Sequence, residues 1–207
     1  MANWGRHAEA VASLLAFDCY LRRSEYLSLR YRDVARFNDP RNGDGYAGMT
    51  LRLAHTKTGP NQWVPVRSAV VAQAFTNYLD SRNWRSSDRV FPFSASHWSR
   101  LLRQVCVALG MAHIPFVPHS FRHGGATRDF MLGVGIEQIK LHGRCKSTES
   151  ARRYIQQGPA LLLLHTVPEQ VMRDARVLAP CLVEALLYFA GRVPDTQPRA
   201  RRLVHFH

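Results

Sequence analysis

The sequence predicts a mainly α-helical fold with one small antiparallel β-sheet, which is an α+β class. Apolar residues recur at helical spacing through most of the chain, and a single pair of neighbouring segments alternates apolar and polar residues as a strand does. With 207 residues and a hydrophobic share of 46%, the chain is long and apolar enough to build one core. No shift in composition divides it, so we expect one domain.

The N-terminal half is predicted to hold two helices followed by a β-hairpin. Apolar residues at helical spacing predict a helix over Ala8–Tyr20, and a shorter helix is expected over Ser24–Tyr31 with Ser24 as its N-cap. Met49–His55 and Gln62–Val66 alternate apolar and polar residues, and the turn-forming residues 58–61 lie between them. This pattern predicts two antiparallel strands joined by a turn.

The rest of the chain is predicted to be helical. Pro115 and Pro118 interrupt the chain, Gly133 and Gly135 end one helix, and Pro180 breaks the last one. The periodicity predicts helices over six segments, Ser68–Arg82, Ser96–Leu109, Ser120–Leu132, Ile136–His142, Thr148–Gln156 and Glu169–Ala190.

The net charge of +13 and the pI of about 10.5 predict a polyanionic partner, most simply nucleic acid. Lysine occurs only at Lys57, Lys140 and Lys146, and the other basic residues are arginines, whose planar forks suit phosphate. The alternative is an arginine-rich composition with an ordinary solvated basic surface. The charge alone does not decide between the two.

The four cysteines are widely spaced, and they form neither a metal-binding pair nor a disulfide framework. We therefore expect a reduced, intracellular protein. The apolar runs are too short or too interrupted to span a membrane. The sequence has no paired carboxylates, no H-E-x-x-H motif and no glycine-rich phosphate loop, so we expect no metal and no nucleotide cofactor.

Three residue types that suit phosphoryl transfer occur between positions 119 and 154. His119 and Arg122 are three residues apart, so they share one face of a helix, and Tyr154 follows about thirty residues later. An imidazole, a guanidinium and a phenol together suggest attack on a DNA phosphodiester without a metal.

Four boxes carry a resemblance to the tyrosine recombinases, the phage-integrase family. Leu21–Leu27 resembles the L-R-x-S-E-L box, Thr56–Gly59 the lysine turn, and His119–Arg122 the H-x-x-R box. Gly143–Ser147, followed by Arg153-Tyr154-Ile155, is similar to the G-R-W-x-S…Y-I-R ending of Crypton-like eukaryotic recombinases. The boxes occur in the order of the family.

The resemblance implies a recombinase catalytic-domain fold and site-specific recombination or integration through a 3′-phosphotyrosyl intermediate. It implies double-stranded DNA as substrate, self-association on DNA and, in a eukaryote, the nucleus. The catalytic core would occupy residues 1–157. Residues 158–192 would form C-terminal helices that pack in cis or are exchanged between subunits, and 193–207 a disordered basic tail. The N-terminal DNA-clamping domain of the family is expected to be absent from this chain, because the first box already begins at residue 21.

The resemblance also implies a role for each site residue. Tyr154 would be the nucleophile, and Arg22 and Arg122 would hold the non-bridging phosphate oxygens. Lys57 would protonate the leaving 5′-oxygen. His119 would hydrogen-bond the phosphate or accept the tyrosine proton.

Two neighbours of these residues raise questions of register. Glu25 is expected to hold Arg22 by an ion pair, which assumes that Arg22 rather than Arg23 is the catalytic arginine. His123 directly follows Arg122 on a different face of the helix, so we do not assign it a catalytic role.

Cys145 departs from the family, which has His or Trp at this position, nine residues before the tyrosine. A thiol is a weak hydrogen-bond donor, so His142 and Arg144 are the candidates to replace it. This departure leaves open a second interpretation, a weakened or domesticated recombinase that acts as a DNA-binding module. Type IB topoisomerases share the chemistry, and a helical interaction protein with chance motifs is the third alternative.

Overall fold

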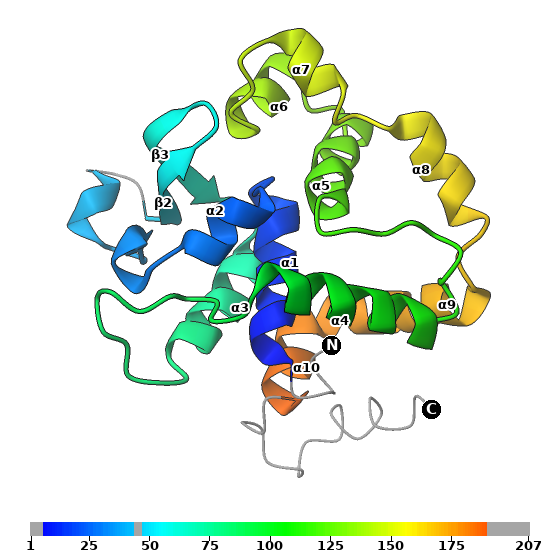
Figure 1. The fold of residues 1–207 in the computed structure, drawn as a ribbon, viewed down its shortest axis with the longest axis horizontal. Helices are drawn as coiled ribbons and strands as arrows, with labels where there is room; N and C mark the ends of the chain where they lie inside the picture. The colour runs from blue at the N-terminus through cyan, green and yellow to red at the C-terminus, as the bar shows by residue number, and fades with distance from the viewer. Residues whose placement is uncertain (1–5, 44–46, 190–207) are drawn as a thin grey trace.

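The computed structural model describes residues 6–43 and 47–189, so the predicted tail 193–207 lies outside the described residues. The fold is mostly helical with one three-stranded antiparallel sheet, as predicted (Figure 1). Helix α1 runs through the middle and packs against α3 and α5. The elements are α1 (His7–Asp18), α2 (Arg23–Ser28), η2 (Tyr31–Asp33), β1 (Val34–Ala35), η3 (Pro40–Asn42), β2 (Met49–Thr56), β3 (Gly59–Val66), α3 (Ala69–Leu79), α4 (Ala95–Ala108), α5 (Ser120–Met131), α6 (Ile136–His142), α7 (Thr148–Arg152), α8 (Gln157–Leu164), α9 (Glu169–Leu178), η4 (Ala179–Cys181) and α10 (Leu182–Phe189).

The sheet has the strand order β1-β2-β3, and all neighbours are antiparallel. Met49 pairs with Val66 and Leu51 with Val64, so the buried side chains of both long strands face the same core. The predicted hairpin is therefore confirmed, but its strands are longer and its turn is shorter than expected. Lys57 lies in the turn itself.

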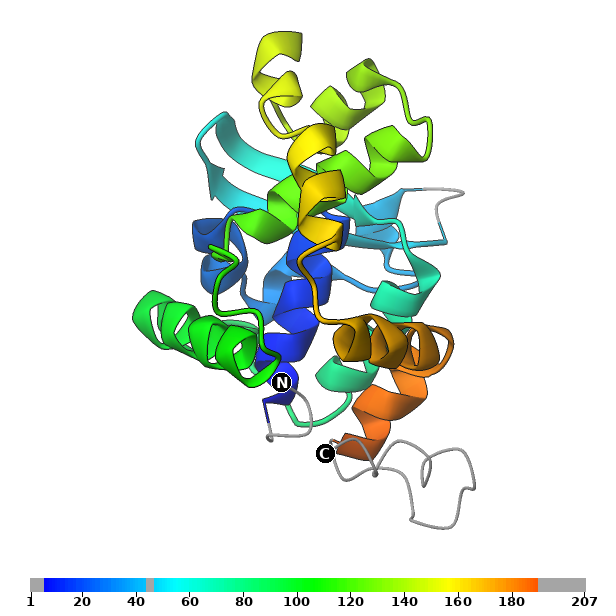
Figure 2. The same ribbon diagram turned by 90° about the vertical axis from the view of Figure 1, so that its right-hand side faces the viewer.

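The main core lies between α1, α3, α4 and the sheet. Trp98, Phe75 and Phe91 are fully buried and sit among the buried aliphatic residues of α1 and β2. A second, smaller cluster forms where Tyr20, Ala126 and Ile139 meet. It joins the end of α1 to α5 and α6, and it carries the predicted site. Figure 2 shows α6 and α7 at the opposite end of the molecule from α10.

Several predicted boundaries were wrong, and local hydrogen bonds explain two of them. Helix α2 begins at Arg23 rather than at a Ser24 cap, because the Glu25 carboxylate accepts the backbone N–H of Arg22 at 2.8 Å. Helix α7 ends at Arg152, not at Gln156. The N–H of Gln156 donates to the Thr127 hydroxyl at 3.0 Å instead of continuing the helix.

Besides the short 3-10 helices η2 and η3, the predictions missed strand β1 and helix α8. Strand β1 has only two residues, which is too short to display an alternating pattern. Helix α8 has continuous rather than periodic apolar residues, and Leu161–Leu164 are all exposed. The last predicted helix is confirmed over its described part, with the expected break at Pro180 between α9 and α10.

Among the described residues, every helix is too short or too polar to traverse a lipid bilayer.

Helices α1 and α5 pack closely because α5 carries glycine at the contact. A Cβ added to Gly125 would lie 2.0 Å from the Phe17 carbonyl oxygen and 2.9 Å from the Tyr20 ring. Backbone and a buried ring cannot yield as a flexible side chain can, so the helices would have to separate.

The change Gly125→Ala is therefore expected to lower the free energy of unfolding by about 3 kcal/mol, as overpacking does in other cores. Denaturant unfolding followed by circular dichroism measures this. Gly135→Ala is the matched control, because a Cβ there meets nothing within 4 Å, and its effect should stay within about 0.5 kcal/mol. Equal effects of the two changes would contradict the close packing.

Helix α6 is attached to the end of α1 through His142. Its Nε2 donates to the Asp18 carbonyl at 2.8 Å, and its ring stacks edge-on to Tyr20 with centroids 4.6 Å apart. Burial lowers the pKa of His142 to about 4, and the nearby Arg67 and Arg144 add to this, although the bond to the Asp18 carbonyl opposes it.

We expect this histidine to make the fold acid-sensitive. The unfolded chain takes up the proton near pH 6.5 and the folded chain only near pH 4, so stability is present above about pH 6.5 and is lost between these values, by about 2 kcal/mol at pH 5. Urea unfolding at pH 7.5 and pH 5 measures the loss, and His142→Gln should remove that share of it. If His142→Gln loses as much stability on acidification as the wild type does, the buried imidazole is not responsible.

Candidate active site

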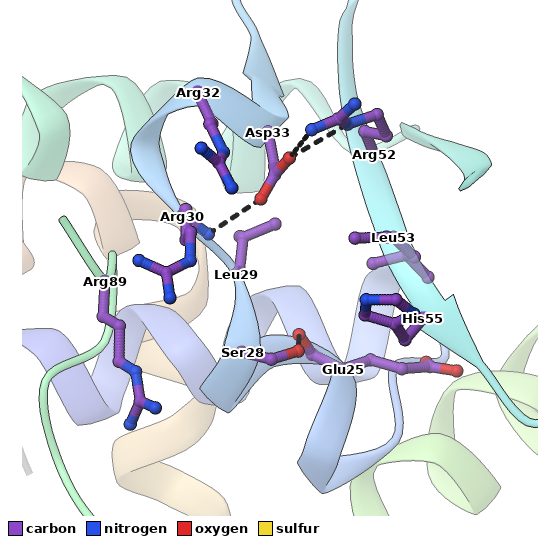
Figure 3. Close-up of a pocket in the computed structure, with 11 residues that line it drawn as sticks. Glu25, Ser28, Leu29, Arg30, Arg32, Asp33, Arg52, Leu53, His55 and Arg89 are labelled. Atoms are coloured by element: carbon purple, nitrogen blue, oxygen red, sulfur yellow. Dashed lines mark hydrogen bonds and ion pairs between the residues drawn. The ribbon is translucent and has the colours of Figure 1, made fainter. Parts of the chain in front are cut away.

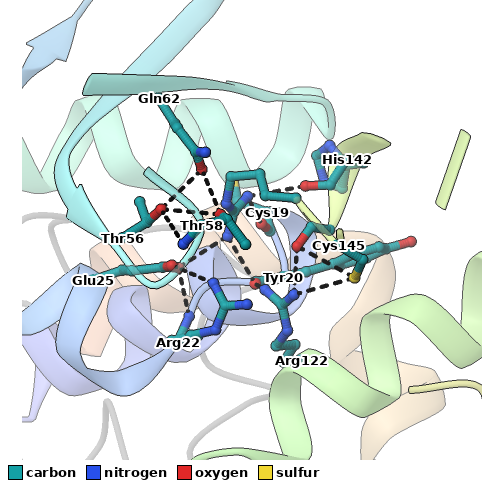
Figure 4. Close-up of polar contacts among 12 residues, drawn as sticks. Cys19, Tyr20, Arg22, Glu25, Thr56, Thr58, Gln62, Arg122, His142 and Cys145 are labelled. Carbon is teal, nitrogen blue, oxygen red and sulfur yellow. Dashed lines mark hydrogen bonds and ion pairs between the residues drawn. The ribbon is translucent and has the colours of Figure 1, made fainter. Parts of the chain in front are cut away.

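Arg22 lies at the start of α2, held by a buried carboxylate. Glu25 has a side chain only 1% exposed, and it accepts the backbone N–H and the Nη1 of Arg22, each at 2.8 Å (Figure 4). Burial lowers the pKa of Arg22, but the bonds to Glu25 and an interaction with the Tyr154 phenol raise it more, so the net shift is upward. Arg22 therefore faces Tyr154, whereas the neighbouring Arg23 is exposed.

Glu25 also accepts from Arg144 at 2.9 Å. The Arg144 side chain is 7% exposed, and it donates as well to the carbonyls of Cys19, Tyr20 and His142. One carboxylate thus binds arginines that are 122 residues apart in the sequence. Burial lowers the pKa of the Arg144 guanidinium, and the Glu25 charge partly restores it.

Arg122, in the first turn of α5, is fully buried. Its guanidinium donates to the carbonyl oxygens of Tyr20 and Gly143, and it lies against the Tyr154 ring, 4.4 Å from the ring centroid. The Nε of Arg122 has no hydrogen-bond partner among the described residues. Burying a charged group without a carboxylate partner costs free energy, so the position of this arginine calls for a specific reason.

The Tyr154 ring lies against two histidine rings, edge-on to His119 and tilted to His123. Its ring centroid lies 5.0 Å from that of His123 and 5.7 Å from that of His119, and the two histidine rings are 4.8 Å apart. Partial burial, His123 and two arginines lower the pKa of His119, which favours its neutral form. His119 therefore has the protonation state of a proton acceptor.

His123, for which no catalytic role was predicted, nevertheless lies at the site. Its ring centroid is nearer to that of Tyr154 than the His119 ring centroid is. Tyr154 follows the end of α7, so its ring folds back over α5 and reaches both histidines. Thr127 fixes this segment by donating to the Tyr154 carbonyl at 3.2 Å and accepting from Gln156. Nothing in the sequence marked Thr127 as a site residue.

Cys145 lies at the site but makes only weak contacts. Its sulfur is 3.7 Å from Arg122 Nη2 and 3.7 Å from the Gly143 carbonyl. The two proposed substitutes are both occupied by the protein, His142 by the Asp18 carbonyl and Arg144 by Glu25 and three carbonyls. The protein thus takes up the terminal nitrogens of Arg144 and the Nε2 of His142, and of the Arg144 donors the Nε is left without a partner among the described residues.

Lys57 is the predicted site residue on the β-hairpin. It is exposed in the β2–β3 turn, and across residues 6–43 and 47–189 its ammonium forms no hydrogen bond or ion pair. The turn itself is ordered by Thr56, whose hydroxyl bonds the Gly59 carbonyl at 2.7 Å. The structure thus brings together Arg22, His119, Arg122, Cys145 and Tyr154, whereas Lys57 forms no hydrogen bond or ion pair with them within the described residues.

The cluster is suited to bind an anion next to a phenol. Two guanidiniums border the Tyr154 ring and a neutral imidazole lies beside it, so a negatively charged ligand and a proton acceptor would meet at the same phenol. Within the described part of the chain, no group of three acidic, histidine or cysteine side chains is placed to hold a metal ion.

Comparison with known proteins gives matches in structure but not in sequence. No family model and no curated protein matches the chain. The crystal structure of XerA recombinase matches 80% of this chain and 57% of its own, with a TM-score of 0.55 and 20% identity. The Tn1549 transposon integrase in complex with circular intermediate DNA matches 75% of this chain and 57% of its own, with a TM-score of 0.52 and 14% identity.

An R225K form of the same integrase, also bound to a circular intermediate DNA, matches at a TM-score of 0.50 and 15% identity over 77% of this chain. The chain therefore spans little more than half the length of these solved structures. At such identities the likeness concerns the fold, and the chain has the fold of a tyrosine recombinase catalytic domain.

Proposed function

We propose that this chain is a catalytic domain of the tyrosine recombinase family that breaks and rejoins double-stranded DNA in site-specific recombination or integration. The observation that carries the proposal is the convergence of Arg22, His119, Arg122 and Tyr154, which come from three separate segments of the chain. The DNA-bound integrase among the structural matches supports DNA as the substrate, and the net charge of +13 agrees with it.

In this proposal Tyr154 attacks the phosphodiester and the 5′-oxygen leaves. The tyrosine then holds the DNA 3′ end as a phosphotyrosine, which conserves the bond energy, so no metal or nucleotide is needed. Arg22 and Arg122 stabilise the charge that grows on the non-bridging oxygens. His119 accepts the phenol proton, and Lys57 donates a proton to the leaving oxygen once DNA draws the β2–β3 turn inward.

The chain is proposed to self-associate on DNA, and helices α8 to α10 either pack on their own subunit or are exchanged with a neighbouring one. The exposed Leu161–Leu164 of α8 support a contact with a neighbouring subunit.

The Gly143–Ser147 box supports placement in the Crypton-like branch, which would put the protein in a eukaryotic nucleus.

A second function has a specific observation in its favour. The Arg122 guanidinium is fully buried and bonded to two carbonyls, and Cys145 replaces a stronger donor. A DNA-binding module that no longer cuts would tolerate both features. The two functions differ in one measurable product, the covalent protein–DNA adduct.

The decisive experiment is to trap that adduct. The purified chain is incubated with a pool of nicked duplexes of random sequence, and SDS-resistant complexes are detected by a label on either side of the nick. We expect wild type to link to the DNA fragment that carries the 3′ end at the cleaved bond, and Tyr154→Phe to abolish the link because it lacks the nucleophilic oxygen. Tyr31→Phe, outside the cluster, should leave it intact.

A folded wild type that binds DNA but gives no adduct would favour the binding module over the enzyme. An adduct that survives in Tyr154→Phe would move the nucleophile to another residue.

Glu25→Gln tests whether the buried carboxylate positions Arg22. Loss of its charge leaves the buried Arg144 guanidinium without a counter-charge, so we expect the free energy of unfolding to fall by about 3 kcal/mol. We also expect adduct formation by the folded variant to slow about 100-fold, because Arg22 loses its orientation. Chemical denaturation and a time course of the adduct measure the two effects.

The matched control is Glu149→Gln, which breaks an exposed ion pair with Arg153 and should change stability by no more than about 0.5 kcal/mol. A folded Glu25→Gln protein with the wild-type adduct rate would restrict Glu25 to a role in stability.

A further inference from the structure

A second basic site shares Glu25 with the candidate active site. A cavity of about 270 Å³ opens between the end of α2, η2, strand β2 and the segment before α4. Four arginines line it, Arg30, Arg32, Arg52 and Arg89. Figure 3 shows Arg30, Arg32 and Arg89 on one side of this arginine cavity, with Arg52 and His55 opposite.

The acidic residues of the lining do not neutralise these charges. Asp33 is taken by Arg52, at 2.9 Å from Nε and 2.5 Å from Nη2, and by the backbone N–H of Arg30 at 3.2 Å. Glu25 is taken by Arg22 and Arg144, which lie outside the cavity. The carboxylates thus leave the guanidiniums of Arg30, Arg32 and Arg89 without a counter-charge in the lining.

The three remaining guanidiniums are held near one another by the backbone. Arg30 and Arg89 pair across an isolated β-bridge, and the Arg30 Nη1 donates to the Ser87 carbonyl at 2.5 Å. The N–H of Arg32 donates to the Ser86 carbonyl. Over residues 6–43 and 47–189, the side chains of Arg32 and Arg89 form no hydrogen bond or ion pair. The fold thus gathers like charges in a hollow and leaves the side-chain donors of Arg32 and Arg89 unused.

We propose that the arginine cavity binds a phosphate group. A planar carboxylate is satisfied by one guanidinium fork, whereas a tetrahedral phosphate offers oxygens in several directions to forks that come from several segments. The cavity is also large enough for such a group. Its source is either the backbone of the bound duplex or a free phosphate ion, and both present the same chemistry.

This site does not depend on strand cleavage. None of its arginines contacts Tyr154, and phosphate binding requires no DNA. A chain that fails to form a covalent adduct would still be expected to bind phosphate here, so the two proposals can fail separately.

The test combines a site-specific probe with a matched pair of variants. Arg32→Gln/Arg89→Gln removes two exposed charges from the cavity, and Arg103→Gln/Arg176→Gln removes two exposed charges from α4 and α9. Inorganic phosphate is titrated at constant ionic strength, and the Nε–H signal of Arg30 is followed in ¹H–¹⁵N spectra, with Arg30→Lys to assign it. This signal separates the cavity from phosphate bound near Tyr154.

We expect saturable binding in the wild type and in the α4/α9 control, and at least tenfold weaker binding in the cavity variant. In a second arm, duplex binding is measured against salt by fluorescence anisotropy. If the source is the DNA backbone, the negative slope of log K against log salt becomes shallower by about one or two in the cavity variant relative to the control. If the slope does not change, the source is the free ion.

The proposal is overturned if the cavity variant and the control are equal in both arms. Thermal unfolding of each variant verifies that the fold is retained.

Discussion

The C-terminal end of α1 is the point on which the candidate site depends. The last carbonyls of a helix have no partner within the helix, and they carry the negative end of its dipole, so donors with positive charge are favoured there. Here the carbonyls of Asp18, Cys19 and Tyr20 accept from His142, Arg144 and Arg122. One helix end thereby joins α5 and the α6–α7 connection to the segment that carries Arg22.

The negative charge of Glu25 offsets part of the repulsion among the arginines of the site. Three largely buried guanidiniums, those of Arg22, Arg122 and Arg144, come together here, and the buried carboxylate is bonded to two of them. Arg122 remains uncompensated except by carbonyl dipoles and the face of the Tyr154 ring. An anion that approached this cluster would therefore find one strong cation with a spare Nε donor beneath the ring. Because Arg122 is fully buried against this ring, a phosphate could reach its guanidinium only after the groups that cover it are displaced.

Much of this could be predicted from sequence because the signals were local. Helical spacing located α1, α3, α4, α5 and α6 to within a few residues, and the alternating strands located the hairpin. The failures come from contacts between distant segments. The Thr127 hydroxyl ends α7 from another helix, and no pattern around Tyr154 could reveal it. His123 was set aside on helix geometry alone, but Tyr154 reaches it from outside that helix.

Cys145 can be understood from the neighbours it has. A larger residue here would have to share space with Gly143, where even an added Cβ would lie 3.2 Å from the Cys145 sulfur and 2.9 Å from the Ile139 carbonyl. The thiol instead leaves room for Arg122 to reach the Gly143 carbonyl directly. The small thiol and the buried arginine thus share one packing arrangement, in which the Arg122 guanidinium bonds the Gly143 carbonyl and lies against the Cys145 sulfur. Any DNA cleavage at this site must then rely on Arg22, Arg122 and His119 rather than on a donor at position 145.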